Sequence, residues 1–395
     1  MLDLSGRLAA LVEGRRHLVA EGANPFGVCL DRVISPTEAI VDGRPILLAG
    51  TNNYLGLSFA RECVEAAREA AATSGTGTTG SRVANGTHAL HRRLERRLAE
   101  LFDVAGAIVF STGYLANLGV FSALLGPGDT VLIDADAHAC IYDGCRLSGA
   151  TMVRFRHNDC ADLDRRLTRL SRSSPPGLVV IAVEGIYSML GDCAPLPGIV
   201  EVKRRHGAVL VVDEAHSFGV LGAKGRGLAD ATGCGDEADF IVGTFSKSVG
   251  TTGGFCVSSR PGLDLLRYSS RPYVFSASPA PPIAAAALAA LDLIDEGEDL
   301  RRRLWDNAAR LHAGLAALGL DLAAPPGPIV AVRMPDEETL AACWRGLLER
   351  GVYVNLALPP GTPHGTYLLR CSVSAAHTPD QIDRICRSFA EVARG

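Results

Sequence analysis

The stretch GTFSKSVGTTGG, residues 243–254, places a lysine, Lys247, among hydroxyl residues and glycines directly after the apolar run DFIVG. Such a run is typical of a buried strand, and the small and hydroxyl residues that follow it are typical of a turn. What a lysine at the end of a buried strand can do depends on what the other strands bring to the same place.

Seven short apolar segments between residues 106 and 259 have the pattern of strands. They are GAIVF (106–110), TVLIDAD (130–136), TMVRFRH (151–157), GLVVIAVEG (177–185), AVLVVDEAH (208–216), DFIVGTFS (239–246) and GGFCVSS (253–259). Several are continuous β-branched runs, as in strands that are buried on both faces of a parallel sheet. Helical patterns between them fit crossover connections. We therefore predict an α/β fold with a mostly parallel seven-stranded sheet between helices.

The pattern of predicted helices and strands changes after about residue 290. Two charged amphipathic helix patterns there alternate with the strand patterns IVAVRM, VYVNLAL and TYLLRCSV, which indicates a smaller α+β domain. The first residues, MLDLSGRLAALVEGRRH, have the pattern of an amphipathic helix. We expect an N-terminal helix and arm over 1–57, a large α/β domain over 58–290 and a C-terminal α+β domain over 291–395.

Composition excludes several classes of protein. The 395 residues carry 39 Lys and Arg against 43 Asp and Glu, a net charge of −4, so neither nucleic acid nor an anionic membrane is expected as the main partner. No apolar window is long enough to span a membrane, and no signal peptide is recognised. The 11 cysteines form no CxxC pair, which indicates reduced thiols in a cytoplasmic protein. His88 and His91 are expected to be solvated helix residues rather than metal ligands.

The carboxyl ends of the predicted strands carry the polar residues. Ligands of open α/β sheets bind beyond these ends. The first strand leads into STGY, a turn before a helix that is suited to bind phosphate. The second leads to His138, the fifth to Asp213 and His216, and the sixth to Lys247. No GxxxxGK[ST] motif occurs and no GxGxxG follows the first strand, so nucleotide-binding folds are disfavoured.

One cofactor needs this set of groups, namely pyridoxal 5′-phosphate. It requires a lysine for covalent attachment, an acid at the ring nitrogen, a group against the ring face and an anion-binding turn. A carboxylate beside the pyridine nitrogen keeps that nitrogen protonated, and a partly desolvated lysine loses its proton more readily. Thr244 and Ser246 can bind the phosphate beside Lys247.

The chain resembles the α-oxoamine synthases, which are fold-type I, aspartate aminotransferase-like enzymes that depend on pyridoxal phosphate and join an amino acid to an acyl-CoA. The resemblance covers nearly the whole chain. It rests on NYLGL, GTGTTGSRVANGTH, FSTGYLANL, DADAHACIYDG, VEGIYSMLGD, VDEAHSFGVLG and GTFSKSVGTTGGF. The implied fold has the seven-stranded sheet and a smaller C-terminal α+β domain.

Details within the family indicate the branch that uses L-serine and a long-chain acyl-CoA. Serine follows the lysine in TFSKSVGT, where the aminolevulinate, ketobutyrate-ligase and oxononanoate branches usually have KA. The segments TGSRVANG, RPYVFSAS and AAHTP also favour this branch. Two alternatives stay open: condensation of glycine or alanine with a different acyl-CoA, and a non-catalytic regulatory subunit, which should lack Lys247.

The resemblance also implies roles for single residues. Lys247 would hold the cofactor and move the Cα proton, Asp213 would pair with the pyridinium nitrogen, and His138 would stack on the ring and bind the substrate carboxylate. His216 would contact the ring hydroxyl. The phosphate would be held by Gly113, Tyr114, Thr244, Ser246 and, from the other subunit of a homodimer, Ser276. Substrate would meet Arg370 and either Asn52 or Asn53, under a mobile lid at residues 359–363.

Overall fold

The computed structural model describes residues 4–9, 24, 27–172 and 177–393, and the chain packs as two compact units. The larger unit comprises Asn52–Ser188 and Asp192–Arg303; the smaller comprises Met1–Thr51, Met189–Gly191 and Leu304–Gly395. The expected domain boundaries remain a prediction, because a division by packing does not establish which parts fold independently. Most of the expected N-terminal helix lies outside the described residues.

The larger unit is built around a seven-stranded sheet with the order β4-β10-β9-β8-β7-β5-β6. Its strands are β4 (Gly106–Phe110), β5 (Thr130–Asp134), β6 (Thr151–Phe155), β7 (Val179–Glu184), β8 (Val209–Asp213), β9 (Phe240–Thr244) and β10 (Gly254–Ser258). Each corresponds to one of the seven predicted segments, and the predicted fold class is confirmed. The pairs β5–β6, β5–β7, β7–β8 and β8–β9 are parallel.

Strand β10 is antiparallel to both of its neighbours, β4 and β9. A parallel return from β9 would need a crossover of a dozen or more residues, and the connection over residues 245–253 is too short for one. Lys247 lies in this connection. The tight turn keeps the lysine at the carboxyl end of β9, because Gly250 adopts a φ of 74° and its N–H donates to the carbonyl of Lys247 at 2.9 Å.

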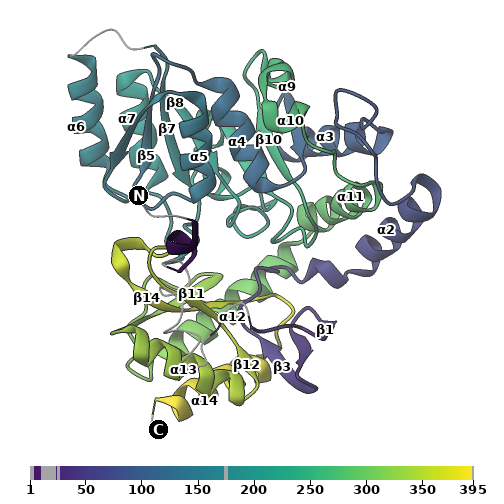
Figure 1. Cartoon of the computed structure of the whole chain (residues 1–395), viewed down its shortest axis with the longest axis vertical. Helices are drawn as coiled ribbons and strands as arrows, with labels where there is room; N and C mark the ends of the chain where they lie inside the picture. The colour runs from purple at the N-terminus through teal and green to yellow at the C-terminus, as the bar shows by residue number, and fades with distance from the viewer. Residues whose placement is uncertain (1–3, 10–23, 25–26, 173–176, 394–395) are drawn as a thin grey trace. The chain divides into compact units, whose positions relative to one another are not determined.

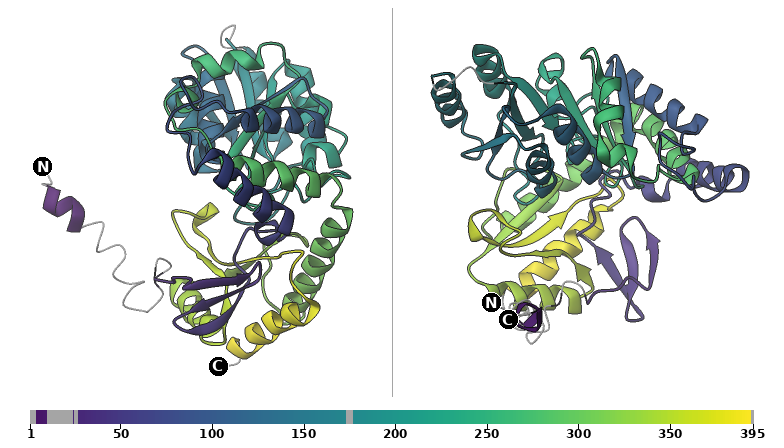
Figure 2. Two further views of the ribbon diagram at one scale, coloured as in Figure 1. Left: turned by 90° about the vertical axis from the view of Figure 1, so that its right-hand side faces the viewer. Right: turned by 45° about the horizontal axis from the view of Figure 1, so that its top comes forward.

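Helices lie on both faces of the large sheet (Figures 1 and 2). The helices of four or more residues in this unit are α2 (Arg61–Ser74), α3 (Ala89–Phe102), α4 (Gly113–Leu124), α5 (Ala139–Ser148), α6 (Cys160–Ser171), α7 (Leu196–His206), α8 (Leu228–Ala231), α9 (Leu266–Ser269), α10 (Arg271–Val274) and α11 (Pro281–Asp295). α12 (Glu298–Ala316) begins here and continues into the smaller unit. Because both faces are covered, the middle residues of β7 and β8 are fully buried, as their apolar runs predict.

The smaller unit contains two small sheets, ordered β1-β2-β3-β12 and β11-β14-β13. Its elements are β1 (Arg32–Ser35), β2 (Glu38–Val41), β3 (Arg44–Leu48), β11 (Ile329–Met334), α13 (Glu337–Glu349), β12 (Val352–Tyr353), β13 (Asn355–Ala357), β14 (Tyr367–Ser372) and α14 (Pro379–Val392). Strands β1 to β3 were not predicted. The signal for the β2–β3 hairpin is Asp42–Gly43, whose φ values of 48° and 73° are those of a two-residue hairpin turn.

The expectation that His88 and His91 are solvated is wrong for His91, which is fully buried. Its Nδ1 accepts from the backbone N–H of His88 at 3.0 Å, and its Nε2 lies 2.7 Å from the carbonyl of Pro279. The two histidines are three residues apart because the side chain of His91 binds the backbone of the N-cap residue His88 at the start of α3. Among the described residues no group of His, Cys, Asp and Glu is arranged to hold a metal ion, and no helix is long and apolar enough to cross a bilayer.

Glu95 on α3 carries the main buried ion-pair network of the larger unit. Its carboxylate accepts two hydrogen bonds from Arg82, at 2.9 and 3.2 Å, one from Arg267 at 2.8 Å, and one from the backbone of Val109 on β4. Glu95 is only 8% exposed. The carboxylate thus joins α3 to the edge of the sheet and pairs with two guanidinium groups, one of which, that of Arg267, also pairs with Asp264.

We expect Glu95→Ala to lower the free energy of unfolding by about 3–5 kcal/mol, because the variant leaves buried positive charge without its partner. Glu100→Ala, an exposed position on the same helix, is the matched control and should change stability by less than about 0.5 kcal/mol. Urea unfolding followed by circular dichroism measures both. Equal stability losses in the two variants would contradict this account of the network.

Candidate active site

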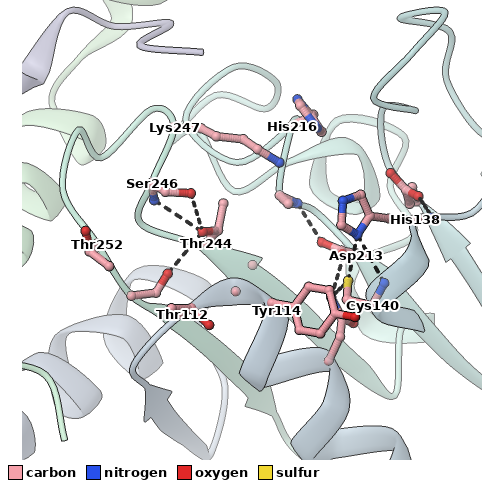
Figure 3. Close-up of a pocket in the computed structure, with 16 residues that line it drawn as sticks. Thr112, Tyr114, His138, Cys140, Asp213, His216, Thr244, Ser246, Lys247 and Thr252 are labelled. Carbon is pink, nitrogen blue, oxygen red and sulfur yellow. Dashed lines mark hydrogen bonds between the residues drawn. The ribbon is translucent and has the colours of Figure 1, made fainter. Parts of the chain in front are cut away.

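A cavity of about 280 Å³ opens at the carboxyl ends of the strands of the large sheet (Figure 3). Eight of the predicted site residues line it: Gly113, Tyr114, His138, Asp213, His216, Thr244, Ser246 and Lys247. They come from four separate segments that only the folded sheet brings together. Ser276, Asn52, Asn53 and Arg370 are not among the lining residues. Arg370 belongs to the smaller unit, on β14.

Asp213 ends β8 and lies at the bottom of the cavity, with 4% of its surface exposed. One carboxylate oxygen accepts from the side-chain amide of Asn117 at 2.7 Å, and the other accepts from the backbone N–H of Ala215 at 2.9 Å. These bonds hold the carboxylate in one orientation. A buried carboxylate held in this way can pair with a cationic ring nitrogen of a ligand.

The N-terminus of α4 and the end of β9 form an anion-binding turn. Thr112 caps α4 by accepting from the N–H of Leu115 at 3.1 Å, and Gly113 is the first helical residue. Thr244 Oγ1 lies 2.9 Å from Ser246 Oγ, so two hydroxyls face the helix terminus. Backbone N–H groups at a helix start, together with hydroxyls, provide the donors that a phosphate needs.

This turn has room for a ligand only because its residues are small. A Cβ on Gly113 would lie 2.7 Å from Cβ of Thr244, and a Cβ on Gly254 would lie 2.5 Å from the carbonyl of Thr112. A larger residue at Gly113 would push α4 away from β9, and one at Gly254 would push it away from β10. The glycines therefore serve the close approach of two backbones as well as the turn itself.

Lys247 extends into the cavity toward the end of β8 (Figure 3). Its charge acts on several neighbours: it lowers the pKa of Glu184 and of His138 relative to what their other surroundings would give. Taken over all causes, burial and the nearby Asp213 raise the pKa of Glu184 well above its ordinary value. The raised pKa favours the neutral form of Glu184, which lies beside Asp213 because the two residues are paired in the β7–β8 register.

His138 precedes α5 and caps it, because its Nδ1 accepts from the backbone N–H of Cys140 at 3.2 Å. Its own backbone N–H donates to the carboxyl of Glu184. Burial lowers the pKa of His138, against an opposing effect of Asp213 that raises it. The imidazole is thus a neutral, firmly held ring at the wall of the cavity.

Tyr54, which was not among the predicted site residues, holds the ring of His216. The Tyr54 hydroxyl lies 2.7 Å from His216 Nδ1 and donates to Asn52 Oδ1 at 3.3 Å. Asn53 instead donates to Ser58 at 2.7 Å. Of the two asparagines that the sequence left as alternatives, Asn52 is the one connected to a residue that lines the cavity.

Sequence reasoning missed four residues of this region, namely Tyr54, Asn117, Cys140 and Glu184. All four were contained in quoted motifs, NYLGL for Tyr54, FSTGYLANL for Asn117, DADAHACIYDG for Cys140 and VEGIYSMLGD for Glu184. Their spacing in the sequence does not indicate a site, because each residue contacts the site through a neighbour that lies on another strand or helix. The position of Glu184 at a strand end was the one feature that could have indicated it.

The cavity fits pyridoxal phosphate on the evidence of its own residues. The anion-binding turn, the buried Asp213 carboxylate and the amine of Lys247 line one cavity, and the small residues at the turn leave space for a phosphate. Thr244 and Ser246 would hold the phosphate with the α4 terminus, Asp213 would face the ring nitrogen, and Lys247 would provide the attachment point.

Comparison with known proteins points to the same chemistry. The family model described as aminotransferase class I and II matches residues 44–389. A serine palmitoyltransferase of Caulobacter vibrioides is 55% identical, over 94% of this chain and 91% of its own length. An 8-amino-7-oxononanoate synthase of Geobacter metallireducens is 42% identical, over 91% and 92%. A solved serine palmitoyltransferase with PLP as an internal aldimine has a TM-score of 0.96 and 46% identity, over 99% of this chain and 98% of its own.

Beside the cavity, His157 forms a charged cluster with the end of β5. Its Nδ1 lies 2.8 Å from Asp134 and its Nε2 lies 2.7 Å from Asp192. Burial acts to lower the pKa of His157, but the hydrogen bonds and charges of the two carboxylates outweigh it and raise this pKa to about 10. The ring also packs edge-on against Tyr187, with centroids 4.5 Å apart.

The stabilising effect of His157 is expected to depend on pH. Because its folded pKa is raised above the ordinary value of 6.5, the contribution is fully present below pH 6.5 and is lost as the pH rises through about 10. The difference in free energy of unfolding between the wild type and His157→Asn should therefore shrink from pH 6.5 to pH 10. Urea titrations across this range measure it. A difference that stayed constant or grew would show that His157 is not held as a cation.

Proposed function

We propose a function for this chain on the basis of the family to which it belongs, the aminotransferase class I and II family. Its resemblance to the α-oxoamine synthases is confirmed by its relatives. Within this family we propose that the chain is a serine palmitoyltransferase. It would condense L-serine with a long-chain acyl-CoA such as palmitoyl-CoA, releasing CoA and carbon dioxide and forming 3-ketodihydrosphingosine, the first step of sphingolipid biosynthesis.

The observation that carries the proposal is the full-length identity of 55% to a serine palmitoyltransferase, combined with a cavity in which eight predicted residues meet. The alternative of a non-catalytic subunit is disfavoured because Lys247 is present and lines the cavity. An 8-amino-7-oxononanoate synthase remains the second candidate, since such an enzyme is 42% identical over a similar length.

Pyridoxal phosphate, when bound, supplies an electron sink that stabilises negative charge at the α-carbon of an amino acid. The chain's residues would do the rest. Lys247 would hold the cofactor covalently and then, once displaced by substrate, accept the proton from the α-carbon. Asp213 would keep the ring nitrogen protonated, because an opposite charge nearby favours the charged form. His216, held by Tyr54, would orient the ring through its hydroxyl.

Three residues would recognise the amino acid substrate, namely His138, Arg370 and Asn52. His138 would stack on the ring and donate to the serine carboxylate. Arg370, which is 4% exposed and donates to Ser372 at 2.8 Å, would bind this carboxylate during the reaction, and Asn52 would contact bound substrate. Residues 359–363 would act as the lid. These roles are proposed from the resemblance and the local contacts of each residue.

A homodimer with shared active sites is part of the proposal, in which Ser276 of one copy reaches the phosphate of the other. Supporting it, three large apolar side chains within about a dozen residues of Ser276 in the sequence are open to solvent: Leu265 is 67% exposed, Tyr268 79% and Phe275 74%. Large exposed apolar side chains mark protein interfaces where they form a patch. Burial against a second copy would account for their exposure in the single chain. We propose that the enzyme is located in the cytoplasm. A homodimer of this kind could also contact a membrane peripherally to release a lipid product.

Incubation of the purified protein and pyridoxal phosphate with serine, glycine or alanine and a ladder of acyl-CoAs tests the activity. We expect mass spectrometry to find 3-ketodihydrosphingosine with serine and palmitoyl-CoA as the main product. Lys247→Ala should lose at least 10³-fold in turnover together with the visible band of the bound cofactor, at roughly the scale of a lost general base and nucleophile. Lys224→Ala, an exposed lysine of the same unit, is the control and should retain both.

A main product from alanine would favour the second candidate instead, and a main product from glycine would favour another α-oxoamine synthase. Turnover that survived in Lys247→Ala would overturn all three, because each depends on the same lysine.

Replacement of Tyr268 and Phe275 together by Asp should shift the protein from a dimer toward the 41.5 kDa single chain. Two carboxylates would have to be desolvated at the interface. Sedimentation velocity measures the shift. Leu147→Asp, a 65% exposed position on α5, is the matched control and should leave the dimer intact. A wild type that sediments as a single chain at micromolar concentration would refute the dimer.

A further inference from the structure

The protonation state of His138 is decided by its place at the start of α5. A helix start leaves backbone N–H groups without helical partners, and a capping side chain must accept one of them. Here the acceptor is the imidazole: the Cys140 N–H points at Nδ1 at 3.2 Å. An amide N–H can only donate. Nδ1 must therefore be unprotonated, and the single proton of the neutral ring must be on Nε2.

A second group faces the same ring nitrogen. Cys140 Sγ lies 3.0 Å from His138 Nδ1. Since Nδ1 is an acceptor, the thiol must be the donor. Burial, followed by the charges of Asp213 and Glu184, raises the pKa of the Cys140 thiol far above its ordinary value, so the proton needed for this bond is present.

The thiol is in turn held by Asn117 on α4. The amide nitrogen of Asn117 lies 3.2 Å from Cys140 Sγ and 2.7 Å from the Asp213 carboxylate. A carboxylate only accepts, so the NH₂ group rather than the oxygen must face Asp213. Its two N–H groups then serve Asp213 and the sulfur. Each of the three bonds from Asp213 through Asn117 and Cys140 to His138 thus has one donor and one acceptor.

We propose that Asn117 and Cys140 are positioning residues that hold His138 as the tautomer protonated at Nε2, and that they link this choice to the carboxylate of Asp213. The Nε2–H lies on the side of the ring away from Cys140 and is free of the capping bonds. It is the donor that an anionic carboxylate of an amino acid substrate requires, a role that rests on the proposed function. The tautomer itself does not depend on that function.

The charges around the ring are consistent with this arrangement. Asp213 at the end of β8 and Asp143 on α5 favour the imidazolium, whereas Lys247 after β9 and burial oppose it, and the net effect is a lowered pKa for His138. From α4, the ring of Tyr114 meets the imidazole edge-on at 6.4 Å. From β7, Glu184 binds the backbone N–H of His138 and leaves both ring nitrogens available.

Nitrogen NMR of the protein labelled with ¹⁵N-histidine tests the tautomer directly, in the cofactor-free and the cofactor-loaded protein, with His138→Gln used to assign the signals. We expect His138 to show an unprotonated Nδ1 and a protonated Nε2 in both. The opposite tautomer, or an equal mixture, in the wild type would overturn the proposal. Because this readout needs no turnover, it is independent of whether the chain acts on serine.

Variants separate positioning from packing. Cys140→Ala removes the thiol donor and leaves only the backbone N–H facing Nδ1. We therefore expect a minor population of the other tautomer, an upward shift of the pH at which His138 protonates, and a raised KM for the amino acid. Cys140→Ser keeps a donor and should restore the wild-type tautomer. Cys145→Ala removes a buried thiol from the same helix, away from His138, and should leave the signals of His138 unchanged. A tautomer and a protonation pH unchanged in Cys140→Ala would contradict the role of Cys140.

Discussion

The arrangement of the site depends on one buried carboxylate, that of Asp213 at the end of β8. A charge in this position is costly unless it is hydrogen-bonded and near a positive group. The backbone of Ala215 and the amide of Asn117 supply the hydrogen bonds, and Lys247 lines the same cavity. Burial, and after it the charge of Asp213 across the β7–β8 register, drive Glu184 toward its neutral form.

The same requirement organises the walls of the cavity. Asn117 reaches Asp213 because α4 begins immediately beyond β4. The start of α4 can approach β9 and β10 because Gly113 and Gly254 are small. Glu184 holds the main chain of His138, and Cys140 holds its ring. Polar groups that would be expensive to bury singly are satisfied by one another, which is how a buried network makes one arrangement of side chains more stable than the alternatives.

Much of the fold was predictable because each strand of the large sheet is a local pattern. A continuous β-branched run such as that of β8 indicates burial on both faces, and all seven runs became strands. The site residues were predictable where they directly follow such a run, as Asp213 and Lys247 do. His91 was misjudged because a charged helix pattern indicates exposure of a face on average, whereas this side chain turns inward to cap α3 and bind Pro279.

The sequence by itself determined the seven-stranded α/β class and the attachment of a lysine, an acid and two histidines to strand ends, because these follow from hydrophobic periodicity and short-range order along the chain. Tertiary structure alone decided that Asn117 reaches Asp213 and that Asn52 is linked to His216 through Tyr54. The physical reason is that hydrogen bonds between distant segments depend on distances and directions that exist only after the sheet and its helices have packed.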